Sequence, residues 1–190
     1  GSKAQRESAA KDLALLADEK PKKKVAITAA GAIQPLVMLT ERGTPGQREW
    51  AAKALASLAF EHAANVHAIA VDGGVAPLLK LARDGTEEQK EGAATALAYL
   101  TFQHTGNREE VVSLGGITTL LAQAKGGRRA AAVTLAQLLD TDSAMSELII
   151  REAGGIESLL TAVWARLSFV AWCRLTLVST PVLMGAVTIV

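Results

Sequence analysis

Seven residues recur at a constant interval in this sequence, and the interval restricts the fold more than any other feature. Adding 42 to the number of each residue in the first set gives a residue of the same type in the second set, and we call this step one repeat period. The two sets are Gly31, Leu36, Leu39, Gly43, Thr44, Leu55 and Leu58, and Gly73, Leu78, Leu81, Gly85, Thr86, Leu97 and Leu100. Repetition at a period of about 40 to 47 residues is typical of helical solenoids, in which each unit packs only on its neighbours.

Turn and capping residues divide each unit into three helices. In the second unit, Gly73 separates a short first helix from a second helix, and Gly85 ends the second helix. The segment 86–89, Thr-Glu-Glu-Gln, has a glutamine three residues after a threonine, which is the spacing of a capping box. The segment 44–47, Thr-Pro-Gly-Gln, has the same spacing one repeat period earlier. We therefore expect a long third helix to begin directly after each threonine.

The sequences around these signals resemble the armadillo repeat. The resemblance rests on AAGAIQPLVMLTERGT (29–44) and VDGGVAPLLKLARDGT (71–86), and on the helices AAKALASLAF (51–60) and AATALAYLTF (93–102) that follow them. It covers roughly residues 8–164. The resemblance implies an all-α fold, a right-handed α-solenoid with three helices per repeat, in which the third helices line a concave groove. It also implies a non-enzymatic scaffold for protein-protein interaction.

The positions of these signals predict how the repeats follow one another. Gly1-Ser2 has the composition of a remnant left by tag removal. Leu13 lies one repeat period before Leu55, so the first helix corresponds to the third helix of a partial repeat. The predicted segments are 1–25, with the tag remnant, the partial repeat and a basic loop; 26–65, repeat 1; 66–107, repeat 2; 108–142, a shortened repeat 3; 143–164, the start of repeat 4; and 165–190, an atypical apolar tail.

The third repeat departs from the pattern of the first two. The numbers of Leu97 and Leu135 differ by 38 and not by 42, so four positions (42 minus 38) are missing before its third helix. The segment 126–129, Gly-Gly-Arg-Arg, replaces the threonine cap, and cations at a helix N-terminus oppose the helix dipole. We therefore expect this third helix to start late. Asn107, with Glu110 three residues later, has the capping-box spacing and predicts the start of the first helix.

The basic segment 20–25, Lys-Pro-Lys-Lys-Lys-Val, allows two interpretations. It resembles a monopartite nuclear-import signal. It also aligns with residues 61–67 and 103–109, the polar connections between repeats, which favours a solvated loop. Cys173 is the only cysteine and cannot form an internal disulfide, and no charged segment precedes an apolar stretch as in a signal peptide. We expect a cytoplasmic or nuclear protein.

Charge and motif content favour neither an enzyme nor a metal or nucleic-acid site. The net charge is +1 and 21% of residues are charged, so no strong field toward nucleic acid is expected. His62, His67 and His104 lie in or beside inter-repeat connections without ligand-like spacing, which favours surface or capping roles. Asp140 and Asp142 lack the rest of a calcium ligand set. We expect no enzymatic activity and no cofactor.

The apolar tail, residues 165–190, lies beyond the resemblance. A membrane span is disfavoured because Arg174 and Pro181 interrupt the apolar run that a span needs. The alternatives are that the tail folds over the open end of the solenoid, mediates self-association through an apolar surface, or is foreign to the domain. Of these alternatives we favour burial, either in the same chain or in a second copy.

The resemblance also indicates which residues face a ligand. In the armadillo family an extended peptide lies on the exposed face of the third helices, and importin-type members carry a Trp and, four residues later, an Asn there. The matching positions here are Lys11 and Leu15, Lys53 and Ser57, Thr95 and Tyr99, and Val133 and Gln137. No Trp–Asn pair is present at these positions, which argues against the importin mode of binding a lysine-rich peptide. One turn earlier on the same face are Glu7, Glu49, Glu91 and Arg129.

The charged residues of this face allow two interpretations. Glu7 with Lys11, and Glu49 with Lys53, have the spacing of side chains that pair on one helix. Alternatively, Lys11 and Lys53, with Tyr99 and Gln137 further along, bind an acidic or mixed-charge segment. Three third helices at a packing distance of about 10 Å would hold an extended peptide of about six to nine residues.

The sequence therefore supports two hypotheses of function. The first is a non-enzymatic scaffold that binds an extended peptide segment of a partner protein in the concave groove of the third helices. The alternative is a structural or assembly module that homo-oligomerises through its apolar tail, residues 165–190.

Overall fold

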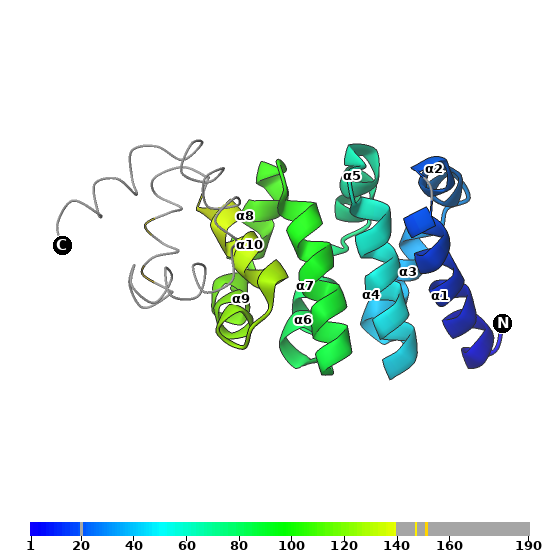
Figure 1. The fold of residues 1–190 in the computed structure, drawn as a ribbon, viewed down its shortest axis with the longest axis horizontal. Coiled ribbons are helices and arrows are strands. Elements are labelled where there is room, and N and C mark those ends of the chain that lie inside the picture. Colours follow the sequence, from blue (N-terminus) through cyan, green and yellow to red (C-terminus); the bar gives the residue numbers. More distant parts are fainter. Residues whose placement is uncertain (20, 140–146, 148–150, 152–190) are drawn as a thin grey trace.

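The computed structural model of this chain describes residues 1–19, 21–139, 147 and 151, which form a row of stacked helices (Figure 1). Every element in this described part is an α-helix, as the sequence predicted. The helices are α1 (Lys3–Glu19), α2 (Pro21–Ala29), α3 (Ile33–Arg42), α4 (Pro45–Ala59), α5 (Ala63–Val71), α6 (Val75–Asp84), α7 (Glu87–Thr101), α8 (Thr105–Ser113), α9 (Gly116–Lys125) and α10 (Arg129–Leu138).

The helices fall into three sets that repeat along the row. The third helices, α1, α4, α7 and α10, lie side by side, and each contacts the next (Figure 1). Each second helix, α3, α6 or α9, packs against the third helix that follows it in the chain. The first helices are α2, α5 and α8. One core therefore extends along the whole row, as expected for a solenoid.

Alanine and leucine build the core around the third helices. Ala51 and Ala52 on α4, and Ala93 and Ala94 on α7, are completely buried. Small side chains let the helices pack closely, and alanine also has the highest helix propensity, so the same residues favour both the helix and its packing. Leu97 is equally buried, and burying such a side chain contributes about 1.5–3 kcal/mol.

Three equivalent glycines make the turns between first and second helices. Gly31, Gly73 and Gly115 have φ angles of 74°, 72° and 69°. Residues with a Cβ atom rarely adopt this left-handed conformation, whereas glycine adopts it freely. The turn predicted at Gly73 and at its equivalent Gly31 is confirmed, and Gly115 makes the same turn one repeat period after Gly73.

Capping boxes start the third helices α4 and α7. The Thr44 hydroxyl accepts the N–H of Gln47 at 3.4 Å, and the Gln47 side chain accepts the N–H of Thr44 at 3.1 Å. Thr86 and Gln89 form the same pair of hydrogen bonds, at 3.4 and 3.0 Å. Both capping boxes were predicted by the threonine-glutamine spacing and are confirmed.

The same two glutamines also join neighbouring third helices, which the repeat pattern did not predict. Gln47 donates from Nε2 to the backbone oxygen of Lys3 on α1, at 2.7 Å. Gln89 donates in the same way to the backbone oxygen of Pro45 on α4, at 2.8 Å. Both glutamines are buried. We call these two contacts the glutamine bridges; each caps one helix and ties it to the previous one.

A third capping box starts α1. Ser2 donates its N–H to Oε1 of Gln5 at 2.7 Å, and the N–H of Gln5 donates to the Ser2 hydroxyl at 3.2 Å. Ser2 lies one repeat period before Thr44, so it takes the place of the capping threonine. The composition of Gly1-Ser2 suggests only a tag remnant; in the fold Ser2 caps α1.

Residues 21–25 of the basic segment are helical, which corrects the interpretation of the segment as a loop. α2 begins at Pro21, and proline suits the first position of a helix because its missing N–H has no partner there anyway. Lys23 pairs with Glu19. Lys24 is buried and donates from Nζ to the backbone oxygen of Phe60 at 2.7 Å.

The start of α8 also differs from the prediction. Its N-cap is His104, whose Nδ1 accepts the N–H of Asn107 at 3.2 Å. Asn107 lies inside the first turn, and its buried amide donates to the oxygen of Leu100 at 2.6 Å. One repeat period earlier, Nδ1 of His62 accepts the N–H of Asn65 at 3.3 Å, and the Asn65 amide donates to the oxygen of Leu58 at 2.9 Å. Capping roles are thus confirmed for two histidines, whereas Asn107 is not a cap.

The last third helix starts late, as predicted. The number of Leu135 is four short of one repeat period after Leu97, whereas α10 begins at Arg129, a full period after the first residue of α7, Glu87. Relative to its leucines, α10 therefore starts four residues later than α7. α10 has ten residues where α7 has fifteen. No side chain caps its first turn.

Other predictions fall outside the described residues. They concern Asp140, Asp142, Cys173, the apolar tail and, except for Glu147 and Arg151, the fourth repeat. The assembly hypothesis, which depends on the tail, lies outside them too. Within the described part, no helix is long and apolar enough to cross a bilayer.

Candidate functional site: the exposed side of the third helices

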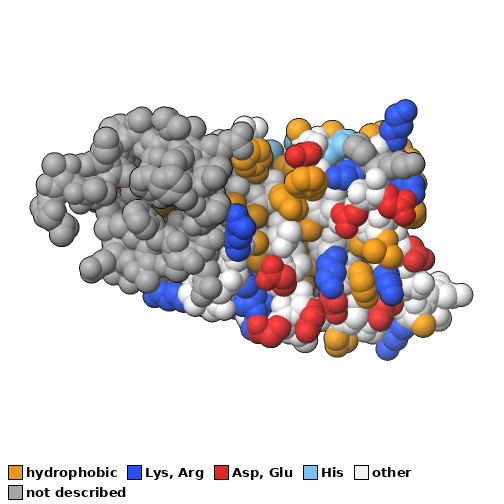
Figure 2. Space-filling view, in the orientation of Figure 1, with side chains coloured by type: hydrophobic (Ala, Val, Ile, Leu, Met, Phe, Trp, Pro, Cys, Tyr) orange, Lys and Arg blue, Asp and Glu red, His pale blue; other side chains and the backbone are white. Residues whose placement is uncertain are grey.

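The third helices expose one side of the row, which we call the third-helix face. Acidic, basic and apolar side chains are interspersed over α1, α4 and α7 on this side (Figure 2). The predicted site residues are Lys11 and Leu15 on α1; Glu49, Lys53 and Ser57 on α4; Glu91, Thr95 and Tyr99 on α7; and Arg129, Val133 and Gln137 on α10. All of these side chains are exposed or half-buried, so they remain accessible to a ligand.

The two lysines of this face have different partners. Lys53 forms an ion pair with Glu49 at 2.6 Å, one turn earlier on α4. Lys11 does not pair with Glu7; its Nζ lies 5.3 Å from the ring centroid of Trp50 on α4. The pairing within one helix is therefore found for the α4 residues and not for the α1 residues.

Trp50 is a residue of this site that sequence reasoning missed. The Nζ atoms of Lys11 and Lys53 lie 5.3 and 4.6 Å from its ring centroid, within the range of cation–π attraction. Tryptophan was expected only at the importin-type positions. Since Trp50 lies three residues before Lys53, the two share a helix face, and this spacing was the available signal.

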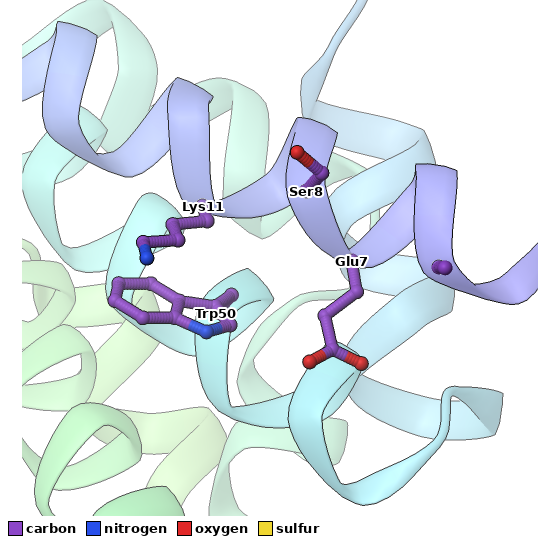
Figure 3. A pocket seen from close by; sticks show the side chains of 5 residues that line it. Glu7, Ser8, Lys11 and Trp50 are labelled. Atoms are coloured by element: carbon purple, nitrogen blue, oxygen red, sulfur yellow. The ribbon is translucent and has the colours of Figure 1, made fainter.

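A small pocket lies between α1 and α4 beside this tryptophan. Its lining residues are Ala4, Glu7, Ser8, Lys11 and Trp50 (Figure 3), and its volume is about 330 Å³. The pocket offers an ammonium group, a hydroxyl, a carboxylate and the edge of an indole ring. It can therefore bind a polar side chain.

Apolar side chains lie toward the C-terminal ends of α4 and α7. The rings of Phe60 and Tyr99 have centroids 5.1 Å apart and are tilted by 56°, a favourable aromatic geometry. Phe60 is 43% exposed, Phe102 is 60% exposed and Leu15 on α1 is 51% exposed. We call Leu15, Phe60, Tyr99 and Phe102 the apolar strip. Phe60 and Phe102 are one repeat period apart, so their equivalence was visible in the sequence although their exposure was not.

Two polar positions of the face are already hydrogen-bonded. The Thr95 hydroxyl donates to the backbone oxygen of Glu91 at 2.9 Å. The Thr101 hydroxyl on α7 donates to Oε1 of Gln137 on α10 at 2.6 Å. Gln137 therefore helps to hold the two third helices together, and Val133 one turn earlier is half-buried beside it.

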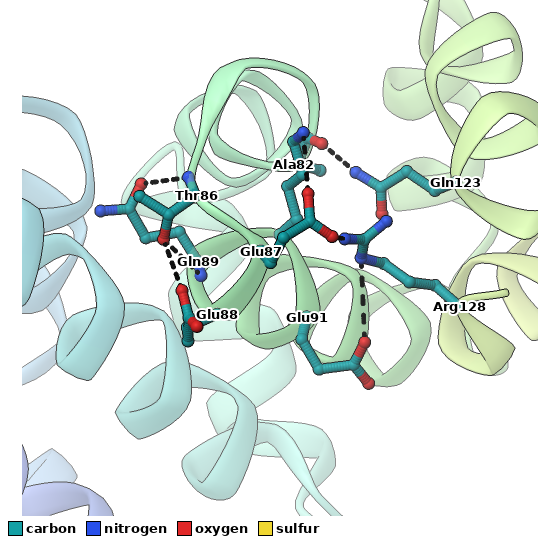
Figure 4. A network of polar contacts seen from close by, with 9 residues as sticks. Ala82, Thr86, Glu87, Glu88, Gln89, Glu91, Gln123 and Arg128 are labelled. Atoms are coloured by element: carbon teal, nitrogen blue, oxygen red, sulfur yellow. Dashed lines mark hydrogen bonds and ion pairs between the residues drawn. The ribbon is translucent and has the colours of Figure 1, made fainter. Parts of the chain in front are cut away.

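An arginine joins α10 to α7, a contact that the sequence did not predict. Arg128 pairs with Glu87, and its Nε lies 3.9 Å from a carboxylate oxygen of Glu91 (Figure 4). Gln123 on α9 donates to the backbone oxygen of Ala82 on α6 in the same region. The positive charge of Arg128 at the start of α10 is therefore balanced by two acidic residues of α7.

One carboxylate beside the face has a shifted pKa. Glu88 accepts its own backbone N–H and the Thr86 hydroxyl, which together hold the pKa of its carboxyl below the ordinary value. Lys53 contributes more weakly in the same direction. The charge of Lys53 is thus felt by a carboxylate of α7 as well as by Glu49 on its own helix.

Metal ligation finds no support in the described residues. Within them, no group of three His, Cys, Asp or Glu side chains is placed to hold a metal ion. His67 is exposed on α5, while His62 and His104 cap helices. The side chains of the third-helix face are of mixed polarity.

Comparison with known proteins agrees with this architecture. Residues 62–102 match the family model described as the Armadillo/beta-catenin-like repeat. No curated protein matches the sequence. A designed armadillo repeat protein in complex with the peptide (KR)4 is 21% identical, with a TM-score of 0.71 over 83% of this chain and 72% of that chain. The armadillo repeats only protein from Plasmodium falciparum is 20% identical, with a TM-score of 0.71 over 90% and 80%.

Proposed function

We propose that this chain, which has the fold of armadillo repeat proteins, is a scaffold that binds an extended segment of a partner protein across its third-helix face. The observation that carries the proposal is the set of accessible polar, charged and aromatic side chains on four adjacent third helices. These helices present their side chains at regular intervals along the row. An extended peptide, whose side chains also recur regularly, matches such a surface.

Neighbouring structures support a peptide as the ligand class. One designed armadillo protein of this fold is in complex with the peptide (KR)4, and a second was computationally designed for modular peptide recognition. That second protein is 21% identical to this chain, with a TM-score of 0.74 over 81% of this chain and 66% of that chain. The basic peptide is the ligand of the first designed protein. For this chain, we infer the charge of the ligand from the side chains of the third-helix face.

The charges on the face favour a segment of acidic or mixed charge. Glu49 and Glu91 are engaged by Lys53 and Arg128, so these carboxylates offer little to a basic ligand. The apolar strip offers a surface for an aliphatic or aromatic side chain of the same segment. Four third helices at about 10 Å spacing span roughly 30 Å, enough for about nine extended residues.

The proposal is tested by selecting binders from a displayed library of random nine-residue peptides and measuring Kd by fluorescence anisotropy. We expect Tyr99→Ala to weaken binding of the selected peptides about tenfold, because aromatic side chains dominate such interfaces. Lys80→Ala is the matched control, since Lys80 is exposed on the second helix α6. Failure to enrich any peptide, or equal effects of both substitutions, would count against the proposal.

A further inference from the structure

We propose that Lys11, held in place by Trp50, is the position that binds an aspartate or glutamate carboxylate of the partner segment. The inference rests on the proposed function and adds the residue that selects the partner's charge. It separates two lysines that the repeat pattern makes equivalent, since Lys53 lies one repeat period after Lys11.

The charge of Lys53 is already balanced within the chain. Its Nζ lies 2.6 Å from Oε1 of Glu49. It also contributes to the lowered pKa of the Glu88 carboxyl on α7, more weakly than the backbone N–H of Glu88 and the Thr86 hydroxyl. A partner carboxylate at Lys53 would have to compete with these acidic groups.

The charge of Lys11 is not balanced in this way. Among the described residues, no carboxylate forms an ion pair with Lys11, and its only electrostatic contact is the face of Trp50 at 5.3 Å. The side chain is exposed. An indole face attracts an ammonium group but does not neutralise it, so the full positive charge remains available to a ligand.

Glu7 lies in the same pocket, but its contacts direct it toward α4. A Cβ atom at Gly46 would overlap the Glu7 carboxylate, so this carboxylate rests directly on the first turn of α4. α4 has no acidic residue of its own in that turn. A carboxylate at a helix N-terminus is stabilised by the partial positive charge of the N–H groups there. Glu7 thus serves the helix start and does not satisfy Lys11.

The pocket also offers a second donor and enough room. Ser8 lies three residues before Lys11, on the same helix face, and lines the same pocket (Figure 3). Its hydroxyl makes no hydrogen bond with any described residue. A volume of about 330 Å³ accommodates an Asp or Glu side chain, whose carboxylate can accept from the Lys11 ammonium.

Trp50 acts as a positioning residue. A free lysine side chain samples many rotamers, and fixing it on binding has an entropic cost. Contact with the indole ring restricts the Lys11 ammonium to the mouth of the pocket before a ligand arrives. We therefore expect an aromatic ring at position 50 to matter for acidic ligands and to be unimportant for ligands that avoid the pocket.

The experiment repeats the peptide selection with the full chain, with Lys11→Met and with Lys53→Met. For the original chain we expect Asp or Glu to be enriched at one peptide position. Lys11→Met should abolish that enrichment and weaken binding of the acidic peptide about tenfold. Lys53→Met should change the Kd of the acidic peptide by about twofold or less. Trp50→Phe should retain the acidic preference and Trp50→Leu should reduce it, because only the first keeps a ring face.

A charge exchange makes the assignment specific. Lys11→Glu should reject the acidic peptide and bind the same peptide with lysine at the enriched position. Enriched peptides without an acidic preference, or a preference that survives Lys11→Met, would overturn this inference and leave the proposed function intact. If no peptide is enriched, the proposed function fails first and the inference fails with it. Because Lys11 is exposed, its variants should fold, which circular dichroism checks.

Discussion

The contact between α4 and α7 and the contact between α7 and α10 join the same kinds of helix by different chemistry. At the first, Gln89 completes a capping box and donates to the backbone oxygen of Pro45, so a neutral and buried side chain makes the link. At the start of the second, Arg128 pairs with Glu87 and Glu91, whose carboxylates are largely exposed to solvent, while Thr101 and Gln137 form a neutral hydrogen bond further along the same contact. The third repeat lacks four positions and the threonine cap before α10. At the place equivalent to the one where Gln89 links α7 to α4, the start of α10 is linked to α7 by the Arg128 ion pair.

This difference shows how a repeat contact tolerates a deletion. The leucines and alanines of α10 keep their buried positions, so the apolar packing survives. The polar link at the start of α10 is formed by the side chains that lie close together after the deletion, Arg128 with Glu87 and Glu91. Hydrogen bonds between neutral buried groups are insensitive to salt, whereas exposed ion pairs are screened by it. The two contacts should therefore respond differently to ionic strength and to truncation.

The largest expected effect comes from removing the core of each contact. Leu97→Ala should lower the free energy of unfolding by about 3 kcal/mol, because the side chain is fully buried and the helix is long. Leu135→Ala should open α10 locally, since this helix has only ten residues and no side-chain cap at its start.

Urea unfolding and hydrogen exchange measure these two effects. Leu97→Ala should shift the main transition, and Leu135→Ala should accelerate exchange mainly in α9 and α10. Equal shifts of one cooperative transition in both variants would mean that the α7–α10 contact is as strong as the α4–α7 contact.

A smaller effect is expected from the glutamine bridge. Gln89→Met keeps the volume of the side chain but leaves the N–H of Thr86 and the oxygen of Pro45 without their partner. Each unsatisfied group has a cost, so we expect a loss of about 1–3 kcal/mol that is the same in low and high salt. Gln5→Met is the matched control: Gln5 has the equivalent position on α1 but is exposed, and should lose much less. A strong salt dependence of the Gln89→Met effect would contradict the neutral link.

The predictions from sequence succeeded where the responsible interactions are local. The glycine turns, the capping boxes at Thr44 and Thr86 and the late start of α10 each depend on a few neighbouring residues. The same local signals recur one repeat period later in the next unit. Because helix and turn signals recur at this fixed period, the all-α solenoid could be predicted.

The contacts that were missed join residues far apart in sequence. The glutamine bridges span 44 positions and the Thr101 to Gln137 hydrogen bond spans 36, so their formation depends on how whole helices pack. Trp50 was missed for a different reason: it lies three positions before Lys53, outside the positions that the family resemblance indicates. The roles of the site residues remain predictions, since side-chain partners on a helix surface do not reveal a ligand.

Removing the ion pair should have a smaller effect than removing the bridge. Arg128→Met should cost about 0.5–1 kcal/mol at low ionic strength, because its partners Glu87 and Glu91 are 74% and 60% exposed. At 1 M salt the screening length falls to about 3 Å, and the difference from the original chain should nearly disappear. The measurement is urea unfolding at both salt concentrations. An effect that persists unchanged at 1 M salt would show that Arg128 contributes by packing.

The smallest effect, and the sharpest test of the comparison, is expected from Arg128→Thr. Position 128 is the N-cap of α10, with extended backbone angles (φ −79°, ψ 108°) and no side-chain cap, so threonine can accept the N–H three residues on. Restoring the cap should contribute about 0.5–1 kcal/mol, and losing the ion pair should remove a similar amount at low salt. The variant should therefore match the original chain at low salt and be about 0.5 kcal/mol more stable at 1 M salt, where the ion pair is screened. Arg128→Ala lacks both interactions and should be less stable than Arg128→Thr in both conditions. If the threonine and alanine variants unfold alike, the missing cap is not what distinguishes the two contacts, and the deletion weakens α10 through its shortened packing alone.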